Sequence, residues 1–282
     1  MSSAALTPIY FYAPSGKDLS DLDDLKLCIE IGDDHLAFTV SDASGKNIYF
    51  FGYYNCETAF RQRELEQLLS SELSLQRSFT DVILLNNTTR FVLVPEQFHK
   101  EHLAETVLET VHGNRELTSV HTDNIHQWEI SVIYGLEKSL EDMVMDKFPQ
   151  TRTVHFVSPV LRYAFRNMDL TCKQSLKLYF YKDSFLAMVF VGDQLQILQH
   201  FNFVTTEDVL YHMLNIVEKY GLDVTEIMVN VSGYLDIHAS IWKELKKHFL
   251  EIYLEECAVV KTDHSAFPSH YFTPFFMVPT CV

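Results

Sequence analysis

Two short stretches that begin with the same three residues decide the fold: LKLCIEI at residues 25–31 and LKLYFY at residues 176–181. Both are mainly apolar runs of the length typical of buried strands, and a turn signal follows each of them. After each stretch the pattern predicts two more strands, then a helix, a strand, a helix and a strand. An element order that recurs after about 150 residues indicates an internal duplication. The sequence therefore predicts an α/β protein of two related halves, each with the order β-β-β-α-β-α-β.

Turn and cap residues set the expected boundaries of these elements. Thr205, Asp208 and Gly221 fit the N-cap, the capping box and the C-terminal stop of one helix in the second half. Asn86-Asn87 separates two apolar runs and predicts a hairpin turn. In the first half we expect strands over 25–31, 36–40, 47–54, 81–85, 90–94, 128–134 and 153–157, and helices over 58–73, 98–111 and 136–148. In the second half we expect strands over 176–181, 185–191, 195–203, 225–231 and 252–260, and a further helix over 237–248.

The charge of the chain excludes some classes of partner. The 282 residues carry 22 Lys and Arg against 38 Asp and Glu, a net charge of −16. Nucleic acids and anionic membranes are bound through excess cations, so neither is an expected partner. The short basic pairs Lys246-Lys247 and Arg61/Arg63 are typical of solvated helix faces.

The N-terminal residues lack the pattern of a signal peptide, and no apolar run is long enough to span a bilayer. We therefore expect a cytoplasmic protein without membrane insertion.

Residue spacing excludes several familiar kinds of site. The closest glycines, Gly45 and Gly52, are too far apart for a G-x-G-x-x-G turn or a Walker loop. Five cysteines, with no Cys-x-x-Cys, fit neither a disulfide framework nor a zinc ribbon. Neither a G-x-S-x-G elbow nor an H-E-x-x-H helix is present. We therefore predict no catalytic residues and no metal ligands.

The duplicated order of elements resembles the actin-like ATPase superfamily, whose halves have the ribonuclease H-like fold. The chain is most similar to the bacterial division and pilus-assembly members, and to a bacterial family of domains of unknown function with this fold. Those members carry a small subdomain inserted in the first half, and residues 90–148 have a similar order of strand, helix, strand and helix. The segment VSPVL at residues 157–161 resembles the link between their halves. The repeated order of elements places the boundary near residues 166–173, which gives a first half at 1–168 and a second half at 169–282.

The resemblance also implies where a nucleotide would bind. Relatives hold ATP between the halves, with two Asp-x-Gly hairpin turns for the phosphates and a glycine-rich turn for the adenosine. The matching first turn contains Glu30 in place of the acid that organises Mg²⁺, and it keeps Gly32. Asp33 and Asp34 replace small residues, and their charges would repel a triphosphate unless a metal intervened. A polar hairpin turn without a ligand is the alternative for this segment.

The other two motifs are weaker. The second turn retains only Lys182 and Asp183 as charged residues, and it contains no glycine that would allow close approach of a phosphate. The third motif reduces to Ser232 and Gly233 after a strand. The resemblance therefore implies a vestigial nucleotide cleft made of Glu30, Gly32, Lys182, Asp183, Ser232 and Gly233.

These degenerate motifs favour a pseudo-ATPase over an enzyme. We expect a non-catalytic adaptor or scaffold that needs no cofactor, is a monomer or weak oligomer, and binds another protein. A divergent Mg-ATP-binding ATPase or small-molecule kinase, and a filament-forming assembly protein, are the alternatives. The tail at 263–282 is rich in Phe and Tyr, and we expect it to pack on the first half, with docking onto a partner as the alternative.

Overall fold

The structure is a computed structural model that describes residues 6–13, 24–57, 60–115, 118–168, 171–257 and 267–282. The chain divides into two compact units. The first contains the described parts of Met1–Phe165 together with Met277–Val282. The second contains the described parts of Arg166–Ala258 together with Phe267–Phe276.

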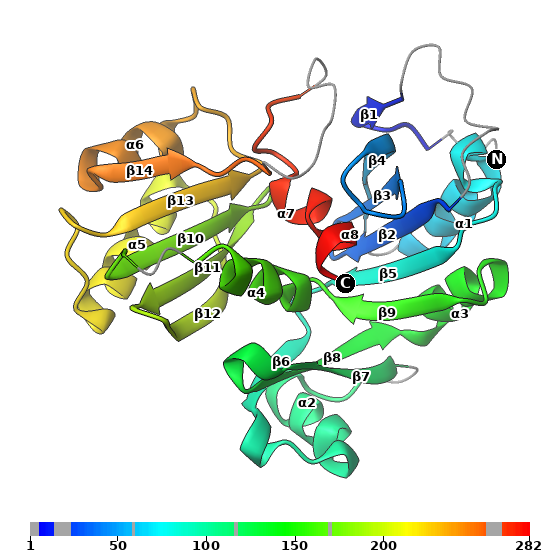
Figure 1. Ribbon diagram of the computed structural model, residues 1–282, viewed down its shortest axis with the longest axis horizontal. Helices are drawn as coiled ribbons and strands as arrows, with labels where there is room; N and C mark the ends of the chain where they lie inside the picture. The colour runs from blue at the N-terminus through cyan, green and yellow to red at the C-terminus, as the bar shows by residue number, and fades with distance from the viewer. Residues whose placement is uncertain (1–5, 14–23, 58–59, 116–117, 169–170, 258–266) are drawn as a thin grey trace. The chain divides into compact units, whose positions relative to one another are not determined.

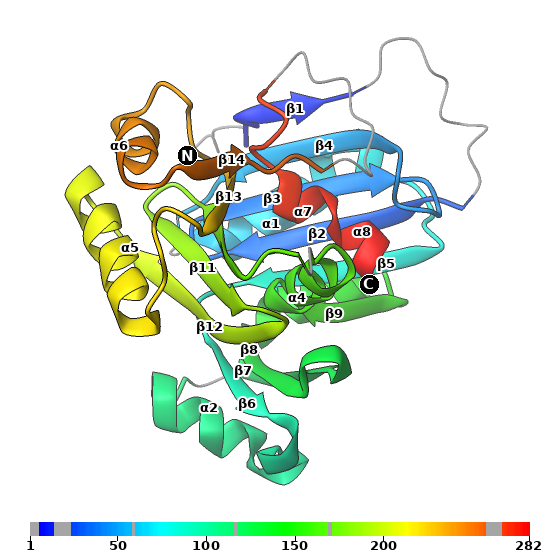
Figure 2. The same ribbon diagram turned by 60° about the vertical axis from the view of Figure 1, so that its left-hand side comes forward.

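The first unit is built on a six-stranded sheet in the order β1-β4-β3-β2-β5-β9 (Figure 2). Strands β1, β4, β3 and β2 are antiparallel to their neighbours in this order, whereas β5 and β9 are added parallel to β2. The strands are β1 (Tyr10–Tyr12), β2 (Lys26–Gly32), β3 (His35–Ser41), β4 (Ile48–Asn55), β5 (Asp81–Asn87) and β9 (Thr151–His155). Parallel strands end at a common edge, so this edge collects the residues that follow β2, β5 and β9.

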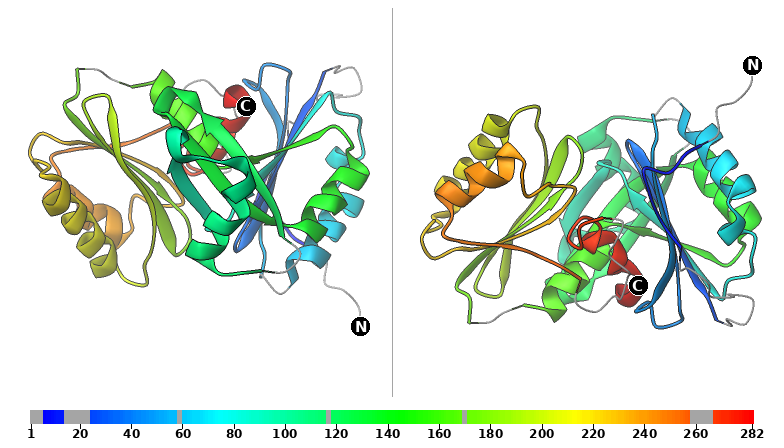
Figure 3. Two further views of the ribbon diagram at one scale, coloured as in Figure 1. Left: turned by 90° about the horizontal axis from the view of Figure 1, so that it is seen from below. Right: turned by 90° about the horizontal axis from the view of Figure 1, so that it is seen from above.

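Two helices cover one face of this sheet, α1 (Arg61–Ser71) and α3 (Lys138–Lys147), and they lie side by side (Figure 3). Leu65 of α1 and Leu140 of α3 are buried in one cluster with Leu27 and Ile29 of β2. Burial of apolar area is the main force that holds such layers together. The short helix α8 (Val278–Cys281) also belongs to this unit.

A small three-stranded antiparallel sheet is inserted in the first unit, in the order β6-β8-β7. Its strands are β6 (Phe91–Pro95), β7 (Thr118–Ile125) and β8 (Ile130–Glu137), and helix α2 (Ala104–His112) packs on it through Ala104 and Leu108. The predicted hairpin at Asn86-Asn87 is wrong, because β5 continues through both residues and β6 belongs to the inserted sheet. Strand β7 was not expected from the sequence.

The second unit repeats the core of the first. Its sheet has the order β12-β11-β10-β13-β14, which matches β4-β3-β2-β5-β9 strand for strand (Figure 1). The strands are β10 (Gln174–Phe180), β11 (Ser184–Val191), β12 (Gln194–Asn202), β13 (Met228–Gly233) and β14 (Glu251–Leu254). Because β10 takes the place of β2, the duplication and the expected mixed α/β fold are confirmed.

Helices α5 (Thr206–Tyr220) and α6 (Ser240–His248) lie side by side in this unit (Figure 3). The predicted capping box of α5 is present: the Thr205 hydroxyl accepts from the Asp208 amide, and the Asp208 carboxylate accepts from the Thr205 amide. Gly221 ends the helix with φ +60°. The strand expected over 252–260 ends at Leu254, and residues 258–260 lie outside the described residues.

The remaining elements in the described ranges are one helix of ten residues and several shorter helices. They are α4 (Val157–Arg166), α7 (Thr273–Phe276) and the 3-10 helices Leu73–Leu75, Glu96–Phe98, Glu101–Leu103 and His126–Trp128. The expected tail begins at 263, and residues 263–266 lie outside the described residues. Of the rest, α7 belongs to the second unit and α8 to the first, where Pro279 packs against Gly45. None of the helices in the described parts is long and apolar enough to cross a membrane.

Candidate functional site

The first predicted turn holds a buried charged cluster at the end of β2. Glu30 and His35 are each 3% exposed, and His35 Nε2 lies 3.2 Å from Glu30 Oε1. The other ring nitrogen, Nδ1, lies 2.9 Å from Asp34 Oδ1. Asn87, the last residue of β5, donates its side-chain amide to the same Glu30 oxygen. The Glu30 carboxylate is thus held by two side chains of its own unit.

His35 is an imidazolium ion in this cluster. Both ring nitrogens face carboxylate oxygens, an arrangement that favours the ring with both nitrogens protonated. Burial by itself would lower the pKa of His35, but the hydrogen bonds and charges of Asp34 and Glu30 outweigh it and raise the pKa from 6.5 to about 9. The ring also stacks on Tyr53, with centroids 5.2 Å apart.

Gly32 is needed beside this ring for steric reasons. A Cβ atom at Gly32 would lie 2.2 Å from Cε1 of His35, well inside van der Waals contact. The expected glycine of the first turn therefore makes room for the His35 ring in this structure.

The second predicted turn joins β10 to β11 in the second unit. Lys182 and Asp183 are both exposed, and the turn is closed by a hydrogen bond from the Tyr181 amide to the Ser184 carbonyl (2.8 Å). The Asp183 carbonyl accepts from the Phe203 amide at 2.9 Å. The Tyr181 amide and the Asp183 carbonyl of this turn are thus already hydrogen-bonded within the second unit.

The third predicted motif lies next to that turn, because the register pairs Gly233 of β13 with Phe180 of β10. The Gly233 amide donates to the His270 carbonyl (2.8 Å), and Gly233 has φ +93°. A Cβ atom there would lie 2.1 Å from the Phe180 carbonyl oxygen. Ser232 is fully buried, and its hydroxyl has no hydrogen-bond partner among the described residues.

The six predicted residues are thus divided between the units. The second unit gathers Lys182, Asp183, Ser232 and Gly233 at one end, whereas Glu30 and Gly32 belong to the first unit.

A buried polar network that the sequence did not indicate lies where β9 ends. Asp123 of β7 accepts from the Ser158 hydroxyl at 2.6 Å and from the Tyr134 hydroxyl at 3.1 Å.

His155 Nδ1 accepts from the Val157 amide at 3.2 Å, and Nε2 donates to the Thr88 carbonyl at 3.1 Å. Burial lowers the pKa of His155 to about 3, so its ring is neutral. Both ring nitrogens are bonded to backbone groups, so His155 cannot act as the base of a Ser-His-Asp triad.

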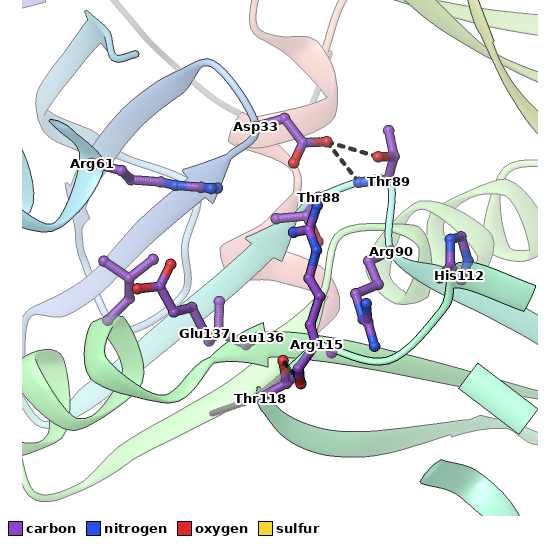
Figure 4. Close-up of a pocket in the computed structure, with 12 residues that line it drawn as sticks. Asp33, Arg61, Thr88, Thr89, Arg90, His112, Arg115, Thr118, Leu136 and Glu137 are labelled. Atoms are coloured by element: carbon purple, nitrogen blue, oxygen red, sulfur yellow. Dashed lines mark hydrogen bonds between the residues drawn. The ribbon is translucent and has the colours of Figure 1, made fainter. Parts of the chain in front are cut away.

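A pocket of about 370 Å³ lies within the first unit, between the edge of the large sheet and the inserted sheet (Figure 4). Its polar lining includes three arginines on separate segments: Arg61 of α1, Arg90 before β6 and Arg115 after α2. The full lining is Asp33, Arg61, Thr88, Thr89, Arg90, His112, Arg115, Thr118, Gly135, Leu136, Glu137 and Leu140.

Arg61 corrects the expectation of a solvated basic pair. Its side chain is 6% exposed and donates from Nη1 to the Gly32 carbonyl at 2.9 Å, while Arg63 is exposed as expected. The first turn of α1 thus directs Arg61 inward, toward the edge where β2 ends. In the described parts of the chain no group of three or more His, Cys, Asp or Glu side chains is placed to hold a metal ion.

The two duplicated units with an inserted sheet define an actin-like ATPase fold. A Bacteroides thetaiotaomicron protein with actin-like ATPase fold and unknown function is similar over 94% of this chain and 99% of its own, with a TM-score of 0.79 and 19% identity. The sequence pattern of the family described as protein of unknown function (DUF3822) matches residues 15–252, and the chain belongs to this family. The resemblance expected from the order of elements is therefore confirmed.

Two further solved structures share the fold at lower similarity. One is the PilM–PilN type IV pilus biogenesis complex, with a TM-score of 0.59, 12% identity, and coverage of 90% of this chain and 96% of that chain. The other is the ethanolamine utilization protein EutJ from Carboxydothermus hydrogenoformans, with a TM-score of 0.51, 7% identity, and coverage of 93% and 91%. No curated protein matches the sequence.

Proposed function

We propose that this DUF3822 chain is a cytoplasmic pseudo-ATPase that serves as an adaptor or scaffold for another protein. The observation that carries the proposal is the buried ion pair between Glu30 and His35. A carboxylate that organises Mg²⁺ must be open to the metal and its waters. Glu30 is instead paired with the imidazolium ion of His35 and bonded to Asn87, both through Oε1, so Mg²⁺ would have to compete with these contacts for the carboxylate.

Contacts in the second unit support the same proposal. Close binding of a nucleotide by a glycine turn uses free backbone amides. The Gly233 amide is bonded to the His270 carbonyl, and a Cβ atom at this position would clash with the Phe180 backbone. The turn at Lys182 and Asp183 adds only exposed side chains. These residues do not fit a Mg-ATP site.

The relatives that share this fold also support a role in binding. PilM has the fold and is part of a complex with PilN. We infer that this chain likewise uses a retained actin-like fold for association with a protein partner.

The test is thermal unfolding with and without millimolar Mg-ATP, together with an assay of ATP hydrolysis. A ligand at a hundredfold excess over its Kd stabilises the native state by about 2.7 kcal/mol, which shifts Tm by several degrees in a chain of this size. We expect no Mg-dependent shift and no hydrolysis in either the wild type or Glu30→Ala. A Mg-dependent shift that disappears in Glu30→Ala would establish an ATPase-like site instead, and nucleotide-dependent pelleting would establish a filament.

A further inference from the structure

The arginine pocket of the first unit contains donors that the protein itself does not satisfy. Arg90 is 8% exposed, and its Nε and Nη1 atoms are buried without a hydrogen-bond partner among the described residues. The same holds for Nε of Arg61 and for Oγ1 of Thr88. Buried polar groups are nearly always bonded, and an unpaired buried cation is especially costly. Four unsatisfied donor atoms on three residues that line one cavity therefore point to a missing acceptor.

The charges around the pocket favour an anion. Among the described residues, no carboxylate oxygen lies within 4.0 Å of a side-chain nitrogen of Arg61, Arg90 or Arg115. Burial, and then the nearby Arg115 guanidinium, lower the pKa of Arg90; the charge of Glu109 acts in the opposite direction but is the smaller effect, so the charge of Arg90 is only partly compensated. Arg61, Arg90 and Arg115 thus bring three positive charges to one pocket in a chain of net charge −16.

The two acidic residues of the lining do not cancel this excess. Asp33 accepts from both the amide (2.8 Å) and the hydroxyl (2.9 Å) of Thr89. Glu137 is exposed, and it accepts from the Ser139 hydroxyl at 2.7 Å. Glu137 is screened by water and salt, and the half-buried Asp33 leaves one negative charge against three guanidinium groups, of which those of Arg61 and Arg90 are buried.

Three guanidinium groups from different segments match a tetrahedral oxyanion better than a planar carboxylate. Figure 4 shows Arg61 and Arg115 extending into the pocket from different sides, with Arg90 beside Arg115. Guanidinium forks bind phosphate oxygens in pairs. The cavity of about 370 Å³ is many times the volume of one water molecule, which occupies about 30 Å³ of the liquid. It therefore has room for an organic group beside a phosphate. Leu136 and Leu140 give the remaining space an apolar wall.

We propose that this pocket binds a small organic molecule through a phosphate monoester group held by Arg61, Arg90 and Arg115. The site lies wholly within the first unit, and it requires neither Mg²⁺ nor a nucleotide. It goes beyond the proposed adaptor role, because it gives the protein a small-molecule ligand of its own.

The test is isothermal titration calorimetry of the full chain in a phosphate-free buffer of low ionic strength. The probes are inorganic phosphate, ribose 5-phosphate and ribose. We expect both phosphates to bind without Mg²⁺ and ribose to show no binding. Arg90→Met and the exposed Arg115→Met should each weaken binding about tenfold or more, as expected for loss of charged hydrogen bonds. Arg63→Met, the matched exposed residue of α1, should bind as the wild type does.

A stability measurement separates a ligand-binding arginine from a structural one. Without phosphate, Arg90→Met should unfold at the wild-type temperature or above it, because a buried unpaired cation is removed. Absence of phosphate binding in the wild type, or wild-type binding in both Arg90→Met and Arg115→Met, would overturn the proposal. Glu30→Ala should leave phosphate binding unchanged, so this result is independent of the outcome with Mg-ATP.

Discussion

Nε2 of His35 lies 3.2 Å from Oε1 of Glu30, and both side chains are almost completely buried. The pKa of His35 is raised from its ordinary value of 6.5 to about 9 in the folded protein. A pKa raised by folding adds stability that is complete below pH 6.5 and is lost as the pH rises through 9. The difference of roughly 2.5 pH units corresponds to about 3 kcal/mol.

We therefore predict that His35→Gln is less stable than the wild type at neutral pH, and that the gap narrows as the pH rises from 6.5 to 9. Denaturant unfolding at several pH values in this range measures the gap. His102 is exposed, so His102→Gln serves as the control. Its free energy of unfolding should change with pH in the same way as that of the wild type. A gap that stays constant with pH would show that His35 contributes packing rather than charge.

His155 should have the opposite dependence on pH. Burial holds its pKa near 3, so between pH 6.5 and 3 the unfolded chain binds a proton that the native protein does not. The wild type should then lose about 1.4 kcal/mol per pH unit from this residue as the pH falls below about 6.5. His155→Gln removes this contribution, and unfolding between about pH 4 and pH 7 should show a shallower slope for the variant. Equal slopes would contradict a neutral His155.

The capping box of α5 gives a local test of helix stability. Thr205 Oγ1 accepts from the Asp208 amide at 3.2 Å, and this bond satisfies one of the unpaired amides at the helix start. Thr205→Ala should cost about 1 kcal/mol. Thr205→Ser keeps the hydroxyl, so most of the stability should be retained, as measured by thermal unfolding. A loss as large in the Ser variant as in the Ala variant would exclude the hydrogen bond as the cause.

The overall fold could be predicted because its signals are local and repeated. Each half opens with three apolar strands separated by short polar turns, and the cap residues Thr205 and Gly221 mark a helix in the sequence itself. The hairpin prediction failed at Asn86 for a tertiary reason. Its side-chain amide donates to the Gly135 carbonyl, and its oxygen accepts from the Thr88 amide, so this polar residue is satisfied inside β5.

The site was less predictable, because its partners are distant in sequence. Strand β7 has few apolar residues and is held by its pairing with β8, which no local pattern reveals. Arg61, Arg90 and Arg115 share a pocket only after the inserted sheet has folded against the larger one. The glycine positions Gly32 and Gly233 were identified from the resemblance, but the partners that pack against them, His35 and Phe180, were not.

Gly233 and Gly192 make a matched pair for the last prediction. Both have positive φ, +93° and +58°, so an alanine strains the backbone at either position. Nothing among the described residues lies within 4 Å of a Cβ atom added at Gly192. Gly192→Ala should therefore cost only about 1 kcal/mol. At Gly233 the added Cβ would lie 2.1 Å from the Phe180 carbonyl oxygen and 2.6 Å from its nitrogen, so the pairing of β13 with β10 must shift. Gly233→Ala should lose about 4 kcal/mol or more, the range of severe core disruption. Thermal unfolding of the two variants measures the difference, and equal losses would mean that the strand end adapts without strain.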